Sequence, residues 1–167
     1  MKYLITYNEL TGSASYPYEL VKTKNIILDD DETVTMITYK FKSKGGNIYT
    51  NILQFKGDDN HMFSVNFQDE DSYFKELDKD GIYDINYLNT NKGDAVMIIS
   101  TVCNIIQDYY EKHKDHLYLF GFTVTEPKRL NIYKYYLQNM FPEWKLEEEE
   151  IKDNIHRLTC TKDIIFD

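Results

Sequence analysis

The stretch that decides the fold reads GDAVMIISTVCNIIQDYYEKH (93–113). Apolar residues recur in it at every third or fourth position from Ala95 to Tyr109, and polar residues occupy the other side. This period predicts an amphipathic helix over residues 94–113. A strand predicted over residues 82–88 precedes the helix and feeds it through a loop that contains a glycine.

The chain continues with LYLFGFTV (117–124), a nearly continuous apolar run. Such a run is typical of a central strand that is covered on both faces. A second helix is predicted to begin near Pro127, because a proline in the first turn costs no hydrogen bond. Pro142 should end this helix.

Most segments on either side of this stretch are predicted strands. Residues 33–42 and 47–55 alternate apolar and polar side chains around Lys44-Gly45-Gly46-Asn47, which indicates a tight hairpin. The remaining predicted elements are strands over 2–7, 18–28, 61–68, 144–151 and 155–161 and a short helix over 69–77. The run Glu147–Glu150 predicts that its strand lies at an exposed edge, where charge discourages unwanted pairing.

The length of 167 residues suits one compact domain, so we expect a single α+β domain over residues 1–167. Its 19 Lys and Arg residues face 28 Asp and Glu residues, a formal net charge of −9. Basic and acidic residues alternate without a dense basic cluster, so nucleic acid is not expected as the principal partner. A basic protein surface is compatible with this charge.

Cys103 and Cys160 are the two cysteines, and they form no CxxC motif. We expect both to be free thiols of a reducing compartment. The first residues do not read as a signal peptide, and no stretch approaches the ~20 apolar residues of a membrane span. We therefore expect a soluble protein with no membrane partner.

The order of elements over residues 33–161 resembles the GNAT-type N-acetyltransferases. In that family a Gln or Arg, two residues, Gly, one residue and then Gly or Ala precede the long helix. Gly93 and Ala95 match this motif, whereas Thr90 stands in the place of the Gln or Arg. The Leu-Tyr pair of the family's second helix corresponds to Ile132-Tyr133.

This resemblance implies a GNAT-like mixed, mainly antiparallel central sheet with two main helices after the fourth strand. It also implies an acetyl-CoA site at the amides of Gly93, Asp94 and Ala95, with Tyr133 as the acid that protonates the leaving thiolate. Asp94 argues against a working site, because its carboxylate competes with a phosphate for the same N–H groups. No spacing selects a general base among Glu70, Glu76 and Asp84.

A second resemblance rests on the start of each helix. Lys-Gly-Asp-Ala at 92–95, followed by Glu126-Pro127-x-Arg129 and the Ile132-Tyr133 pair, is similar to small proteins of tailed bacteriophages without assigned activity. The abundance of Asn, Tyr and Lys fits such a source. The resemblance implies a viral structural or accessory protein with viral protein partners, located in the host cytoplasm or the virion, in an oligomer or larger assembly.

Exposed aromatic residues are the candidates for a contact surface. Tyr110 and Tyr135 should face solvent or a partner, Trp144 lies on the acidic edge strand, and Arg129 is one of two arginines. Ordinary half-exposed tyrosines favoured by codon usage are the alternative. His113 and His116 fit the end of the long helix, where a cation complements the dipole, and they do not indicate a metal site.

The sequence therefore predicts a non-catalytic protein that acts through protein–protein contacts and needs no cofactor. An acyl-CoA-dependent N-acetyltransferase remains the alternative function. An inhibitor of a host defence protein, which would share the acidic surface, is a further one.

Overall fold

A computed structural model of the chain describes residues 15–27, 32–56, 62–77, 94–113, 119–124, 127–153 and 155–162. The predicted strands over 2–7 and 82–88 lie outside the described residues. Every other predicted strand and helix is present, with ends within two residues of the prediction.

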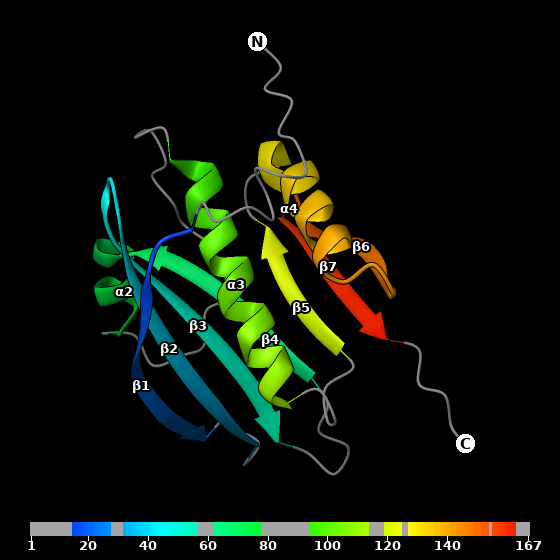
Figure 1. The fold of residues 1–167 in the computed structure, drawn as a ribbon. Coiled ribbons are helices and arrows are strands. Elements are labelled where there is room, and N and C mark those ends of the chain that lie inside the picture. The colour runs from blue at the N-terminus through cyan, green and yellow to red at the C-terminus, as the bar shows by residue number, and fades with distance from the viewer. Residues whose placement is uncertain are drawn as a thin grey trace.

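The described strands form one seven-stranded sheet (Figure 1). Its order is β1-β2-β3-β4-β5-β7-β6, and only β4 and β5 are parallel neighbours. The strands are β1 (Tyr18–Ile27), β2 (Thr33–Ser43), β3 (Gly46–Lys56), β4 (Met62–Asp69), β5 (Leu119–Val124), β6 (Trp144–Lys152) and β7 (Ile155–Lys162). The prediction of a mixed, mainly antiparallel sheet in an α+β fold is confirmed.

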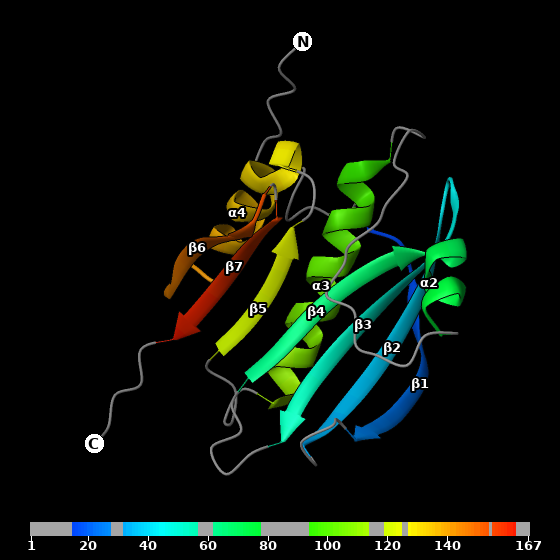
Figure 2. The same ribbon diagram turned by 180° about the vertical axis from the view of Figure 1, so that it is seen from behind.

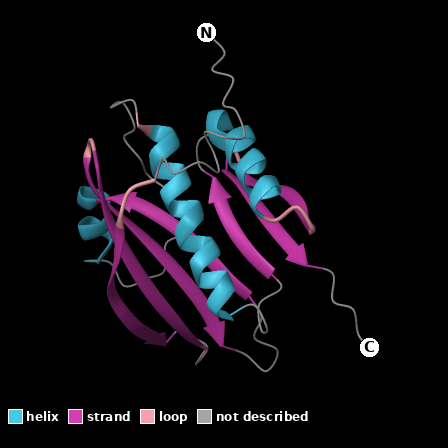
Figure 3. Cartoon of the chain, in the orientation of Figure 1, coloured by secondary structure: helices cyan, strands magenta, loops and turns pink. Residues whose placement is uncertain are grey.

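Two long helices, α3 (Ala95–His113) and α4 (Pro127–Met140), lie on the same face of this sheet (Figures 1 and 3). The short helix α2 (Glu70–Leu77) packs on the opposite face (Figure 2), where Tyr73 stacks on Tyr49 with ring centroids 4.1 Å apart. The crossover from β4 through α3 to β5 explains why these two strands are parallel.

The hydrophobic core fills the space between the sheet and the two long helices. The apolar stripe of α3 that the sequence predicts is buried: its members are Ile98, Ile99, Val102, Ile105, Ile106 and Tyr109, each at most 5% exposed. Phe63, Phe67, Phe120 and Phe122 supply the facing side chains of β4 and β5. Removal of this apolar surface from water is the main favourable term in folding.

The opposite face of the central strands is also buried, and it carries a row of polar residues. Thr38, Asn51 and Asn66 lie side by side on β2, β3 and β4, each at most 5% exposed. The Thr38 hydroxyl donates to Asn51 Oδ1 at 2.8 Å, and Asn51 Nδ2 donates to Asn66 Oδ1 at 2.9 Å. Buried polar groups are tolerated when they are hydrogen-bonded in this way.

Candidate functional site

The turn between β2 and β3 lies against the start of α3. Gly46 has a φ of 124°, so it supplies the backbone conformation that the tight turn requires. Ser43 Oγ donates to the Gly46 carbonyl at 2.8 Å and accepts from the Gly45 amide at 3.2 Å. These bonds hold the turn so that the Lys44 amide points at Asp94.

Asp94 closes the N-terminus of α3. Its carbonyl accepts the first helical hydrogen bond, from the Ile98 amide at 3.0 Å. Its carboxylate is only 4% exposed, and Oδ2 accepts from the Tyr16 hydroxyl at 2.6 Å and from the Lys44 amide at 2.8 Å. One carboxylate therefore joins the segment before β1, the β2–β3 turn and the start of the long helix.

The protonation of Asp94 and Tyr16 follows from this contact. Burial by itself raises the pKa of the Asp94 carboxyl, but the hydrogen bonds from Tyr16 and the Lys44 amide outweigh it and lower the pKa below its usual 3.8. Burial, followed by the hydrogen bond to Asp94 and its charge, raises the pKa of Tyr16 to about 12. An ionised Asp94 and a neutral Tyr16 are thus the stable pair at neutral pH.

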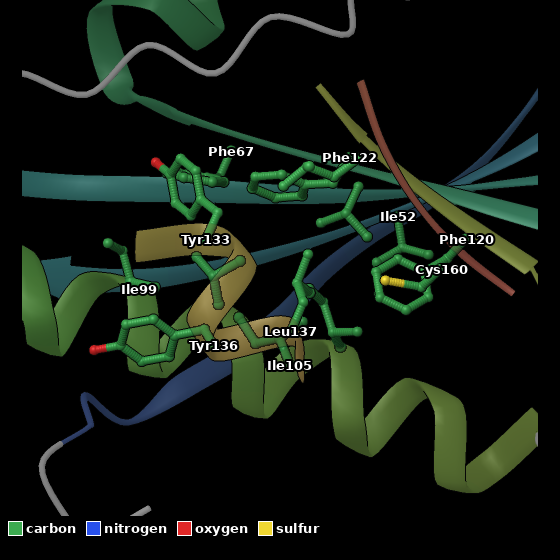
Figure 4. Packing of buried hydrophobic residues seen from close by; sticks show 14 of the residues in the cluster. Ile52, Phe67, Ile99, Ile105, Phe120, Phe122, Tyr133, Tyr136, Leu137 and Cys160 are labelled. Carbon is green, nitrogen blue, oxygen red and sulfur yellow. The ribbon is translucent and has the colours of Figure 1, made fainter. Parts of the chain in front are cut away.

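The parallel strands β4 and β5 part beside this helix start. Their pairing ends at Val65 and Phe122, although β4 continues to Asp69. Three aromatic rings fill the position: Phe67 and Phe122 lie 5.7 Å apart, and Tyr133 of α4 packs its edge against both, at 6.1 and 4.9 Å between centroids (Figure 4). Side chains therefore occupy the space where the two strands part.

A cavity of about 10 Å³ remains behind these rings, which is about the space of one water. Its walls come from the apolar faces of the two long helices and from β4 and β5. Cys103 lies in its lining, and burial raises the pKa of that thiol to about 12, as it does for Cys160. Both cysteines are free. A cavity of this size and lining does not fit a nucleotide-sized ligand.

The residues that the acetyltransferase resemblance names are only partly brought together. Gly93 lies outside the described residues, and Ala95 begins α3 with a side chain that is not described. Asp94 is engaged by Tyr16 and Lys44. Tyr133 is 5% exposed and packs among aromatic rings. Of these four residues, the structure describes the side chains of Asp94 and Tyr133. Asp94 is engaged in internal hydrogen bonds, and Tyr133 packs against other rings.

The predicted contact residues Tyr110 and Trp144 belong to one aromatic cluster. Tyr110 lies edge-on to Trp144 at 5.3 Å and to Phe141 at 5.5 Å, and Phe141 and Trp144 are 5.1 Å apart. Lys162 Nζ donates to the Tyr110 hydroxyl at 3.4 Å. Tyr110 and Trp144 are half-buried and pack against the hydrophobic core, so they are less open to solvent than the sequence predicts for Tyr110.

Tyr135 is the most exposed of the predicted contact residues that the structure describes, at 39%. It stands on the outer side of α4, with its ring 6.4 Å from that of Tyr136. The Arg129 side chain lies outside the described residues.

Strand β6 forms one edge of the sheet, and its acidic run Glu147–Glu150 is exposed, as the sequence predicts. Glu148 faces α4 and forms an ion pair with Lys134, and His156 Nδ1 lies 3.2 Å from Glu148 Oε1. The hydrogen bond from Lys134 is the largest cause of the lowered pKa of Glu148. Glu147 lies on the other face and pairs with Lys145 at 2.6 Å.

The opposite edge, β1, is a surface that the sequence reasoning missed. Leu20, Val21 and Ile27 are 59%, 48% and 73% exposed. The signal was available, because the doublets Leu20-Val21 and Ile26-Ile27 break the alternation of a strand that buries one face. Apolar residues on both faces of an edge strand cannot all be covered.

Together these features define an α+β protein with one mixed sheet, a filled position between its parallel strands and two exposed edges. The chain belongs to a family of unknown function, DUF6934, whose model matches residues 29–152. That match runs from just before β2 to the last residue of β6. No curated protein and no solved structure matches the chain.

Two further observations concern the described part of the chain. None of its helices has both the length and the apolar character needed to cross a membrane. It also holds no group of three or more His, Cys, Asp or Glu side chains placed to bind a metal ion.

Proposed function

We propose that this protein is a non-catalytic bacteriophage structural or accessory protein that acts through protein–protein contacts as a component of an assembled particle. One observation carries the non-catalytic part: side chains occupy the position between β4, β5 and α3 where a cofactor would have to lie. Phe67, Phe122 and Tyr133 close the parting of β4 and β5, and at the start of α3 the Asp94 carboxylate accepts from the Lys44 amide of the β2–β3 turn.

The contact surface supports the second part of this proposal. Tyr135 and the acidic edge of β6 are exposed, and Trp144, at the start of β6, is half-buried. Tyrosine and tryptophan contribute disproportionately to protein interfaces. The viral assignment rests on the similarity at residues 92–95 and 126–133 to small tailed-phage proteins and on the composition.

Affinity capture tests the contact function. A tagged copy, expressed in the cells that produce the protein and cross-linked before lysis, should retain a defined partner in stoichiometric amount. Tyr135→Ala should weaken this capture, whereas Phe74→Ala should not. Phe74 is a matched control, since it is an exposed aromatic residue, 51% exposed, on α2. Recovery of the wild type without any partner would contradict the proposal.

An N-acetyltransferase is the second candidate function. The favouring observation is the parting of two parallel strands beside a helix N-terminus, because α/β sheets bind anionic ligands at such positions. Tyr133 would then be the acid, and the amides of Gly93, Asp94 and Ala95 would hold acetyl-CoA. Calorimetric titration separates the candidates: we expect no heat of binding at millimolar acetyl-CoA, and a measurable dissociation constant would favour the enzyme.

A further inference from the structure

The two edges of the described sheet, β1 and β6, are both open to solvent. Eight of the ten β1 positions and seven of the nine β6 positions are exposed. An edge strand presents unpaired N–H and C=O groups, which can pair with a strand of another chain. Here the two edges also carry opposite charge, with Lys22 and Lys24 in the middle of β1 and Glu147–Glu150 on β6.

The register places these charges on the same face of the sheet. Lys22 is opposite Thr38, whose hydrogen-bonded row with Asn51 and Asn66 lies on the face away from α3 and α4. Lys24, two residues on, shares that face because side chains alternate along a strand.

The same reasoning applies at the other edge. Glu148 faces α4 through its ion pair with Lys134, so its neighbours Glu147 and Glu149 point to the opposite face. The lysines of β1 and these two glutamates therefore lie on one face of the sheet, whose edge strands β1 and β6 are at its two ends (Figure 2).

We propose that β1 of one copy pairs antiparallel with β6 of the next copy, in the register that sets Ile27 opposite Trp144, Lys24 opposite Glu147, Lys22 opposite Glu149 and Glu19 opposite Lys152. This inference rests on the proposed contact function and names the partner as a second copy of this chain. Residues 19–27 and 144–152 are nine residues each, so the register uses all of β6 and all of β1 except Tyr18.

Three opposite-charge pairs result from this one register, and it sets no like charges opposite each other. The strand irregularities also agree. β1 has a register shift between Leu20 and Lys22, and β6 has one between Glu150 and Lys152. In the proposed pairing the two register shifts lie opposite each other. The pair Glu19–Lys152 on one side of the shifts and the pairs Lys22–Glu149 and Lys24–Glu147 on the other side therefore stay on the same face of the sheet.

Strand direction fits as well. Along the order β1-β2-β3-β4-β5-β7-β6, five antiparallel steps and one parallel step leave β1 and β6 running in opposite directions. A second copy placed beside the first in the same orientation thus offers an antiparallel partner. Such a head-to-tail contact repeats and builds a ring or a filament.

Pairing of like edges is less favourable. Two copies of β1 would bring Lys22 and Lys24 together, and two copies of β6 would set one run of four glutamates against another. Like charges directly opposite each other destabilise a strand pair. The glutamates therefore select a strand with lysines at the matching positions and repel others.

Sedimentation velocity of the full chain over a wide concentration range tests this pairing. The wild type should exceed its monomer mass of 19.9 kDa as concentration rises, and molar salt should reverse the association. Lys22→Glu with Lys24→Glu should remain monomeric, and so should Glu147→Lys with Glu149→Lys. An equimolar mixture of these two variants should associate again, because each edge then meets its opposite charge.

Lys42→Glu with Lys112→Glu is the matched control, because it changes the net charge equally at exposed positions away from both edges. It should associate as the wild type does. The inference would be overturned if the wild type stayed monomeric or if the mixture of the two variants stayed monomeric. It would also be overturned if either double variant, studied alone, associated as the wild type does. If the chain does not associate with itself but a different protein is captured from cells, the pairing of β1 with β6 is wrong and the proposed contact function remains. If no protein is captured either, both proposals are wrong.

Discussion

Charge has opposite roles at the inner end of the sheet, where Asp94, Phe67, Phe122 and Tyr133 are buried, and at its two outer edges. At the inner end, one carboxylate, Asp94, is buried and accepts hydrogen bonds from Tyr16 and Lys44, while aromatic rings fill the adjoining position. At the edges, the lysines of β1 and the glutamates of β6 are exposed on strands that have one neighbour in the described sheet, and Glu147 and Glu148 form surface ion pairs with Lys145 and Lys134. A buried charge persists only when it is well paired, whereas an exposed one is free to meet a partner.

The two regions are therefore suited to different roles. At the inner end, Asp94 Oδ2 accepts two internal hydrogen bonds, and the packing of the aromatic rings contributes to stability. Exposed charges at the edges contribute little to stability, so they can be changed at small cost. Substitutions should therefore separate the two regions by the size and kind of their effects.

Substitution of an aromatic ring at the inner end should lower the free energy of unfolding more than any other change considered. Phe67→Ala should lower the free energy of unfolding by about 3–5 kcal/mol, because a fully buried ring leaves a cavity. Urea denaturation measures this loss. Phe74→Ala removes a half-exposed ring from α2 and should cost clearly less. Equal costs for the two variants would show that the inner end is not packed as described.

The next effect concerns the buried carboxylate. Asp94→Asn removes the charge that accepts from Tyr16 and Lys44, and it should cost about 1.5–3 kcal/mol of unfolding free energy, the scale of hydrogen bonds to charged groups.

Asp108→Asn provides the control for that substitution. Asp108 also accepts from a tyrosine hydroxyl, that of Tyr18, but it lies exposed on α3. Its change should stay within about 0.5 kcal/mol, the usual range for surface substitutions. A cost for Asp108→Asn as large as that for Asp94→Asn would remove the distinction between buried and exposed carboxylates in this molecule.

Local patterns predicted the elements of the described chain closely. The helix predicted over 94–113 is Ala95–His113, and the strand predicted over 144–151 is Trp144–Lys152. Both segments carry periods that depend only on nearby residues, 3.6 for the helix and two for the strand. The hairpin around Gly45-Gly46 was predictable for the same reason, because a turn is a local structure.

Long-range contacts were beyond such reasoning. Tyr16 reaches Asp94 across 78 positions of sequence, and Lys44 reaches it across 50. No period encodes either contact. The insertion of β7 between β5 and β6 is likewise a matter of topology. The sequence could show that Asp94 competes for the helix start, but the partners that hold it there required coordinates.

A smaller effect should appear as a dependence of stability on pH. The pKa of Tyr16 is raised from 10.0 to about 12, so the folded state keeps a proton that the unfolded chain loses. The contribution of Tyr16 is thus full below pH 10 and falls as pH rises toward 12. The pKa of Asp94 is lowered, so its contribution is present above 3.8 and is lost as pH falls further.

Chemical denaturation as a function of pH measures both dependences, the loss of stability at alkaline pH from Tyr16 and the loss at acidic pH from Asp94. The difference between wild type and Tyr16→Phe should shrink between pH 10 and 12, whereas Tyr135→Phe, on the outer side of α4, should follow the wild type throughout. A constant difference across this interval would show that the Tyr16 hydroxyl is not held by Asp94.

A still smaller change in stability is expected at the edge, from the ion pair of Glu148 with Lys134 and its contact with His156. Glu148→Gln should lower stability slightly at low salt and not at high salt, because salt screens exposed charges. Glu149→Gln is the matched control, since it removes the same charge from the neighbouring residue on the opposite face. Thermal unfolding at two salt concentrations compares them. If Glu148→Gln lowered stability as much in high salt as in low salt, the contacts of Glu148 would stabilise the fold without being screened. The edge would then resemble the buried inner end.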